Sequence, residues 1–179
     1  MLAGLLCLAS PALADDDKPT LNIDFQTRVS YLNDRVNHNI CHETSGFKGD
    51  YLMLSVSGQL NSRFSYAWRQ RINQKKETND RFDGTDWVYI DYKMNPHWSV
   101  AAGKQVALVG GYEYDRSPLD IYISSEFWNN IAPFQFGASA SYTTTNGKSR
   151  FSAQVTQSLY NTPENRDMLA YHLHWAGNY

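Results

Sequence analysis

Three arginines in one short segment have the charge and spacing to bind anions. Arg63, Arg69 and Arg71 occupy odd positions between residues 63 and 73, and the even positions are mostly aromatic or aliphatic. These even-numbered residues are Phe64, Tyr66, Trp68 and Ile72. Because a period of two places successive side chains on opposite faces, the segment predicts a β-strand with one cationic and one apolar face. A guanidinium is permanently charged, and its planar fork suits phosphate or carboxylate.

Two further cations extend the cationic face. Arg28 and Lys93 fall on the polar faces of the neighbouring predicted strands, so we expect five cations on one side of a sheet. They could line a path for anions, since a low-dielectric wall strengthens their field. They could instead pair with Asp24 and Asp91 and only stiffen the wall, and both interpretations stay open here.

The elements that position these cations are predicted from the same alternation. It marks strands at residues 20–32, 51–60, 63–73, 86–94, 98–109, 134–144, 149–159 and 169–179. Asn146-Gly147 is a strong signal for a tight hairpin turn. Residues 33–49, 74–85 and 110–133 lack a sustained period and predict long loops, the last with a short helical turn around 120–130.

The predicted connections alternate between long and short, which is typical of outer-membrane barrels with short periplasmic turns. Aromatic residues gather at the short-turn ends of the apolar faces, where an interfacial girdle belongs. These are Phe64, Tyr92, Trp98, Phe151, Trp175 and Tyr179. The sequence therefore predicts an all-β, antiparallel transmembrane β-barrel with about eight strands present. A secreted β-sandwich stays as the alternative, although the polar faces carry few of the Lys and Glu expected of one.

The chain of 179 residues predicts one barrel domain with an export signal. Residues 1–14 are uncharged, mostly apolar and end in Ala12-Leu13-Ala14, which predicts a secretory signal peptide. They lack the basic start of such a signal, so its beginning is expected upstream of Met1. Residues 15–18 are predicted to form a polar linker, and residues 19–179 are predicted to form the barrel. The net charge of −2 indicates no particular partner.

Four segments resemble the N-terminal half of the phosphate-selective porin O and P family, in its Bacteroidetes-type branch. They are Gly46-Phe47-Lys48-Gly49, Arg69-Gln70-Arg71, Ala102-Gly103-Lys104-Gln105 and Gly110-Gly111-Tyr112-Glu113-Tyr114-Asp115. The resemblance implies a homotrimer of larger barrels of about sixteen strands, an anion path lined by arginine and lysine, and an early loop folded inward. The chain would supply about half of such a barrel, so we expect either a fragment or a small closed barrel.

The resemblance also implies two sets of site residues. Lys104 is expected to line the pore, although its alternation places it on the apolar face unless a bulge at Gly103 turns it inward. The third long loop is expected to constrict the pore, and without the resemblance it is simply an exposed loop. Its charged residues are Glu113, Asp115, Arg116, Asp120 and Glu126. This acidity argues against strong phosphate selectivity.

The function predicted is passive diffusion of small polar or anionic solutes, phosphate among them, across the outer membrane of a Gram-negative cell. The expected partners are outer-membrane lipid and the solutes, not nucleic acid, because the aromatics and arginines lie on opposite faces. No cofactor is expected. The stretch from His38 to Glu43 lacks a second ligand cluster for a metal, and His172 and His174 are expected on the polar wall. The sequence contains no evident set of a serine, a histidine and an acid of the kind used in catalysis, so no enzyme is expected. The alternatives are a closed eight-stranded structural or adhesive barrel without a pore and a secreted ligand-binding β-sandwich.

Overall fold

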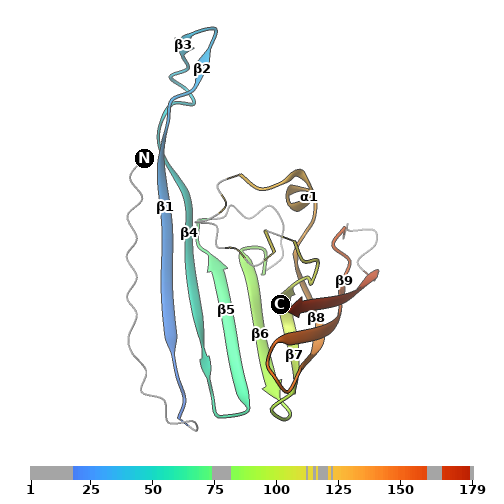
Figure 1. Cartoon of the computed structure of the whole chain (residues 1–179). Coiled ribbons are helices and arrows are strands. Elements are labelled where there is room, and N and C mark those ends of the chain that lie inside the picture. The colour runs from blue at the N-terminus through green and yellow to red at the C-terminus, as the bar shows by residue number, and fades with distance from the viewer. Residues whose placement is uncertain are drawn as a thin grey trace.

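Eight strands form a single antiparallel sheet in the computed structural model of the chain, which describes residues 18–73, 82–111, 113–114, 116, 121, 123–160 and 167–177 (Figure 1). The order along the sheet is β1-β4-β5-β6-β7-β8-β9-β10. The strands are β1 Asn22–Leu32, β4 Gly46–Gln59, β5 Phe64–Arg71, β6 Thr85–Lys93, β7 Trp98–Val106, β8 Phe134–Thr143, β9 Ser149–Gln157 and β10 Leu169–Gly177. The prediction of an all-β, antiparallel fold is confirmed. The predicted signal peptide at residues 1–14 lies outside the described residues.

The region 33–49, predicted as a loop, contains more structure than its sequence indicates. Two short strands, β2 Arg35–Val36 and β3 Asn39–Ile40, form a hairpin that projects beyond the main sheet (Figure 1). Asn37 and His38 make its turn with positive φ angles of 50° and 67°. β4 starts at Gly46 because β1 continues to pair with it there, with Leu32 opposite Gly46. The predicted start at residue 51 was therefore wrong. Pairing with β1 extends the strand over residues 46–50, where the sequence shows no sustained alternation.

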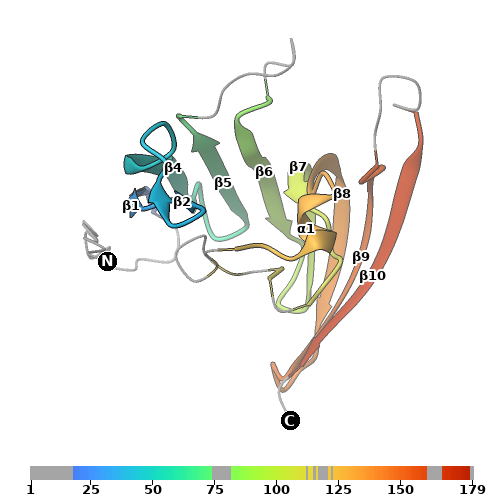
Figure 2. The same ribbon diagram turned by 90° about the horizontal axis from the view of Figure 1, so that it is seen from above.

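The sheet curves strongly, and the segment between β7 and β8 lies on its concave side (Figure 2). This segment contains α1, Glu126–Asn129, within the predicted helical turn. Two opposing glycines lie where neighbouring strands approach closely: Gly103 pairs with Gly137. A Cβ on Gly103 would lie 2.3 Å from the carbonyl oxygen of Val88, and its φ of 133° disfavours other residues.

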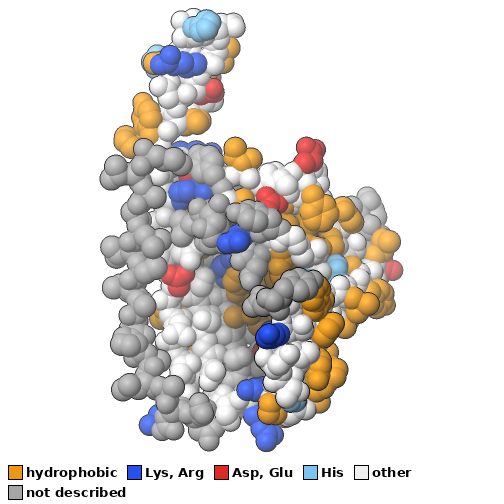
Figure 3. Space-filling view, in the orientation of Figure 1, with side chains coloured by type: hydrophobic (Ala, Val, Ile, Leu, Met, Phe, Trp, Pro, Cys, Tyr) orange, Lys and Arg blue, Asp and Glu red, His pale blue; other side chains and the backbone are white. Residues whose placement is uncertain are grey.

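The two faces of the sheet reverse the usual pattern of a soluble protein. The buried hydrophobic residues among those described are Met53, Ala107 and Ile131, whereas eight polar residues are buried. The latter are Thr85, Asp86, Gln105, Gln135, Ser141, Ser152, Gln154 and Thr156. Apolar side chains on the convex face are exposed, up to 89% for Leu173. Hydrophobic side chains accordingly lie along the outer margin at β9 and β10, and fewer of them are seen towards the centre (Figure 3).

This arrangement differs from a β-sandwich, in which apolar faces of two sheets would cover one another. In the described part of the chain no second large sheet covers the convex face. β1 and β10 form the two edges of the sheet and do not pair with each other, so these strands do not close an eight-stranded barrel by themselves. Within the described ranges, no helix has the length and apolar character needed to span a membrane.

Candidate pore-lining site

The centre of the site is an ion-pair cluster at a bulge between β5 and β6. The register places Arg69 opposite Trp87 and Gln70 opposite Thr85, so Asp86 is the extra residue of the bulge. Asp86 is only 3% exposed. Arg69 Nε donates a hydrogen bond of 2.7 Å to its Oδ2, and the guanidinium lies 3.5 Å from the centre of the Trp87 ring. Arg69 is thus held by a charge on one side and an aromatic ring on another.

Arg71 shares the same carboxylate but is held less tightly. Its Nε lies 2.8 Å from Asp86 Oδ1 without the alignment of a hydrogen bond. The Arg71 side chain is 39% exposed, compared with 13% for Arg69. One carboxylate between two guanidiniums leaves a formal charge of +1 in this cluster. Arg71 is therefore the more exposed and the less tightly held member of the cluster.

A second bulge aspartate that holds an arginine lies between β1 and β4. Asp50 is the extra residue of a bulge there, and its Oδ2 lies 3.0 Å from Arg28 Nε. Arg28 also lies over the ring of Tyr51, 5.0 Å from its centre, and Ser30 Oγ donates to Asp50 Oδ1 at 3.1 Å. Each arginine is therefore placed by a bulge aspartate and by the aromatic residue that follows it.

The acidic partners of these arginines differ from those considered in the sequence. Asp86 and Asp50 hold the arginines, whereas Asp24 accepts a hydrogen bond of 2.6 Å from Gln26 Nε2. Alternation could not reveal the pairing, because a bulge breaks the alternation. The available signal was an Asp directly before an aromatic residue, as in Asp50-Tyr51 and Asp86-Trp87.

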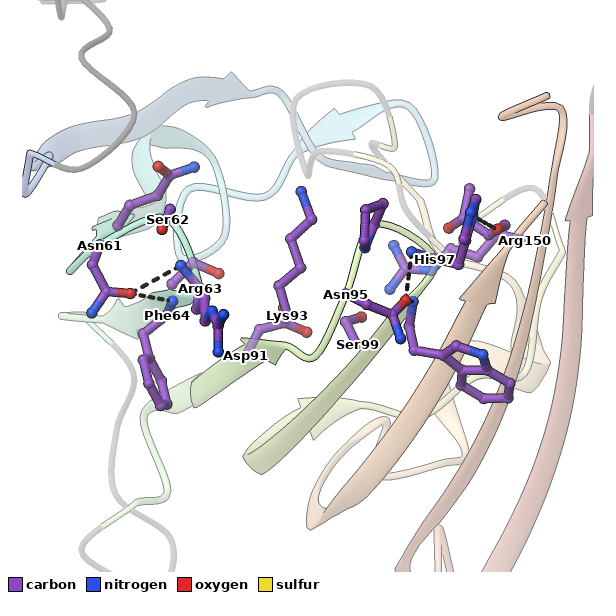
Figure 4. A pocket seen from close by; sticks show the side chains of 15 residues that line it. Asn61, Ser62, Arg63, Phe64, Asp91, Lys93, Asn95, His97, Ser99 and Arg150 are labelled. Atoms are coloured by element: carbon purple, nitrogen blue, oxygen red, sulfur yellow. Dashed lines mark hydrogen bonds between the residues drawn. The ribbon is translucent and has the colours of Figure 1, made fainter. Parts of the chain in front are cut away.

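Arg63 and Lys93 lie at the other end of the concave face, next to the short turns. With Arg150 they line a pocket of about 230 Å³ that also contains Asp91 (Figure 4). The Lys93 backbone N–H donates to the Arg63 carbonyl at 2.8 Å, which holds the two residues side by side. The structure therefore separates the predicted cations into one group near the long loops and another near the short turns.

Lys104 lies on the opposite face from the arginines. It pairs with Val88 and Phe136 and shares the convex face with Val100 and Ala102. The ladders on both sides of β7 show no register shift at Gly103, so the inward turn that a bulge would give is absent. Lys104 Nζ instead donates to the Phe82 carbonyl oxygen at 2.8 Å. The expectation that Lys104 points inward with the other cations was wrong.

The end of β7 and the start of the connection that leads into the third long loop are anchored to the concave face of β9 and β10. Gln154, which is 5% exposed, accepts from Leu108 N at 2.8 Å and donates to the Val106 carbonyl at 3.0 Å. The rings of Tyr114 and His174 lie 5.4 Å apart, centre to centre. The anchor at Gln154 was missed in the sequence because a glutamine on a polar strand face gives no distinctive signal.

The charged residues of this loop have separate roles. The Glu113 carboxylate accepts from both the backbone N–H and the hydroxyl of Ser125, which caps α1. Glu126 is in the first turn of α1, and the Arg116 backbone N–H donates to the Glu113 carbonyl at 3.4 Å. The predicted loop residues Asp115 and Asp120 lie outside the described residues. Glu113 therefore stabilises the loop itself.

The two histidines expected on the polar wall lie there. His172 pairs with Gln154 and His174 with Ser152, both on the concave face. His172 Nε2 lies 3.4 Å from the hydroxyl of Thr156. No group of three or more His, Cys, Asp or Glu side chains arranged for a metal ion occurs among the residues that the structure describes.

One comparison with known proteins identifies a family for this chain. The family model for phosphate-selective porin O and P matches residues 21–179. No curated protein and no solved structure matches the chain. The match spans every strand of the sheet, from β1 to β10. The chain belongs to the phosphate-selective porin O and P family.

Proposed function

We propose that this porin-type outer-membrane chain forms the wall of a diffusion channel that favours small anions, with Arg71 as the main contact. The observation that carries the proposal is the cluster of two guanidiniums around Asp86, with its surplus charge on the more exposed arginine. A positive side chain on a polar, low-dielectric wall attracts anions and repels cations.

The anchored loop supports a particular route for the solute. Gln154 and His174 hold the loop over the concave side of β9 and β10. Arg28, Arg69 and Arg71 lie on the other part of the concave face, on β1 and β5. The open part of the path then runs along the arginine-bearing strands, and the loop narrows it from the opposite side.

The charges of the described residues support a preference for anions over cations. Asp50 and Asp86 are each held by arginine, and Glu113 is held by Ser125. Arg63, Lys93 and Arg150 share their pocket with Asp91, which leaves a formal surplus of two positive charges there. An anion therefore meets a positive surplus at both ends of the concave face. Phosphate and carboxylate both match the guanidinium fork.

The test is the reversal potential of the channel in a planar bilayer under a salt gradient. Arg71→Ala is expected to shift selectivity towards cations, because it removes the surplus charge. Lys104→Ala removes a cation from the convex face and serves as the matched control, with no shift expected. Equal shifts from both variants would contradict the assignment of Arg71. Absence of any conductance by the wild-type protein would contradict the channel itself.

A further inference from the structure

A pocket on the concave face, at the short-turn end of the sheet, brings three cations together with one carboxylate. Its volume is about 230 Å³, below the roughly 300–1,000 Å³ of sites for drug-sized ligands, so it suits a small metabolite. Arg63 and Lys93 lie on one side of the pocket with Asp91, and Arg150 lies on the other side (Figure 4). The inference below rests on the proposed function, since a solute reaches this pocket along the channel.

Asp91 differs from the other acidic residues of the main sheet in having no partner of its own. Asp50 and Asp86 are held by arginines, and Asp24 accepts a hydrogen bond from Gln26. Asp91 is half-buried, yet its side chain makes no hydrogen bond or ion pair with any residue that the structure describes. It stays unpaired although three cations line the same pocket. Its carboxylate is therefore available to a ligand.

The three cations of the pocket are also available. The side chains of Arg63, Lys93 and Arg150 make no hydrogen bond or ion pair within the described ranges. Arg150 is on β9, three strand spacings from Asp91 on β6, which is about 14 Å along a sheet. The opposite charges are thus kept apart, with space for a ligand between them. Asp91 repels a simple anion such as phosphate, whereas it attracts a ligand that also carries a positive group.

Neutral polar groups of the same pocket extend this double character. His97 Nδ1 lies 3.1 Å from the Thr143 carbonyl oxygen, which can only accept, so Nδ1 carries the proton and Nε2 of the neutral ring is an acceptor. The side-chain oxygens of Asn61 and Asn95 accept backbone N–H groups in their turns, which leaves the amide N–H groups as donors. The pocket therefore offers acceptors for an ammonium group and donors for carboxylates.

We propose that this pocket binds an acidic amino acid, which carries two carboxylates and one ammonium group. The ammonium group meets Asp91, one carboxylate meets Arg63 and Lys93, and the other carboxylate meets Arg150. Three cations and one carboxylate give the pocket a formal charge of +2, so it attracts a ligand with a net charge of −1. The guanidinium forks match the carboxylates, and the ammonium group removes the repulsion from Asp91.

The test is the dissociation constants of L-glutamate and glutarate, measured by saturation-transfer NMR on the purified full chain in detergent. Glutarate is the same five-carbon dicarboxylate without the ammonium group. The wild-type protein is expected to bind L-glutamate about fivefold more tightly, although glutarate carries one more negative charge. Asp91→Asn is expected to weaken binding of L-glutamate and to tighten binding of glutarate, so that the order reverses.

The matched control is Asp24→Asn. It removes the same charge from the concave face of β1, outside the pocket, and is expected to keep the preference for L-glutamate. Lys93→Gln is expected to weaken binding of both ligands, because both carry carboxylates.

Three results would overturn the proposal. They are tighter binding of glutarate than of L-glutamate by the wild-type protein, tighter binding of inorganic phosphate than of L-glutamate, and an Asp91→Asn variant that binds both dicarboxylates more tightly by the same factor. The last result would mean that Asp91 only lowers the positive charge of the pocket. Binding of L-glutamate that depends on Asp91, without conductance, would support the site and contradict only the proposed channel. Anion-selective conductance without a preference for L-glutamate would contradict only the ligand assigned to this pocket.

Discussion

Asp86→Asn is the most informative substitution in the arginine cluster. Asparagine keeps the shape of the side chain and can still accept a hydrogen bond, but it carries no charge. Asp86 is 3% exposed and lies 2.7 Å from Arg69 Nε and 2.8 Å from Arg71 Nε. The substitution leaves two guanidiniums without a counter-charge. The formal charge of the cluster rises from +1 to +2.

The expected loss of stability follows from the burial of the pair. At an effective dielectric constant of about 20, opposite charges 4 Å apart attract by about 4 kcal/mol, part of which offsets the desolvation of the carboxylate. Removing one partner of a buried pair typically costs about 3–5 kcal/mol, and we expect Asp86→Asn to lower the free energy of unfolding by this amount. Arg71→Ala should cost only about 0.2–1 kcal/mol, because that side chain is 39% exposed and its ion pair is screened.

The same variants should move the selectivity in opposite directions. Asp86→Asn adds positive charge and is expected to increase the preference for anions. Arg71→Ala reduces the cluster to zero net charge. Even at water-like screening, one unit charge 4 Å from an anion is worth about 1 kcal/mol, which is about fivefold in occupancy. The double variant, Asp86→Asn with Arg71→Ala, keeps only the charge of Arg69, so the formal charge of the cluster is again +1. Its selectivity should return towards the wild-type value.

Two assays separate these expectations: reversal potentials in a potassium chloride gradient, and urea unfolding in lipid vesicles followed by tryptophan fluorescence. Shifts of the reversal potential in the same direction for Asp86→Asn and Arg71→Ala would refute the reasoning from local charge. A double variant that behaves like Arg71→Ala alone would also refute it, because Arg69 would then contribute nothing to the path.

Three further predictions concern the third long loop, the close approach of strands at Gly103 and the apolar convex face. Gln154→Ala removes two hydrogen bonds, of about 0.5–1.5 kcal/mol each, that hold the end of β7 and the residue Leu108 from which the third long loop continues. Single-channel conductance should therefore rise and become noisier, whereas Gln157→Ala should leave it unchanged. Gly103→Ala should cost about 1–3 kcal/mol for its strained backbone conformation and should reduce the heat-modifiable folded form on gels, because its Cβ would also meet a backbone carbonyl. Gly49→Ala, with open space around it, should fold normally. The exposed convex face predicts that the protein stays in detergent or membrane fractions; recovery as a monodisperse species without detergent would contradict this.

The strands and their two faces could be predicted from the sequence because alternation is a local property. Each of the eight strands of the sheet overlaps a predicted one. The row of girdle aromatics was also largely predicted, although Tyr142 was missed between Trp98 and Phe151. Tyr179 lies outside the described residues. The family could be suggested from short segments, and the family model confirms it.

The candidate site was only partly predictable. Arg69 and Arg71 were placed on the correct face, but their shared counter-charge was not found, because Asp86 lies in a bulge. Lys104 was placed with the inward cations by resemblance, against its own alternation, and its alternation proved right. The loop anchor at Gln154 depends on two strands separated by many residues. No local pattern contains that information.

The sequence by itself therefore determined the period, the length and the polarity of the strands, since these depend only on neighbouring residues and on the geometry of an extended chain. The tertiary structure decided which charges neutralise one another and which remain exposed. It did so because a bulge and a long-range pairing bring Asp86 between Arg69 and Arg71 at hydrogen-bond distance. The difference between a tightly held Arg69 and a more exposed Arg71 exists only in the folded sheet.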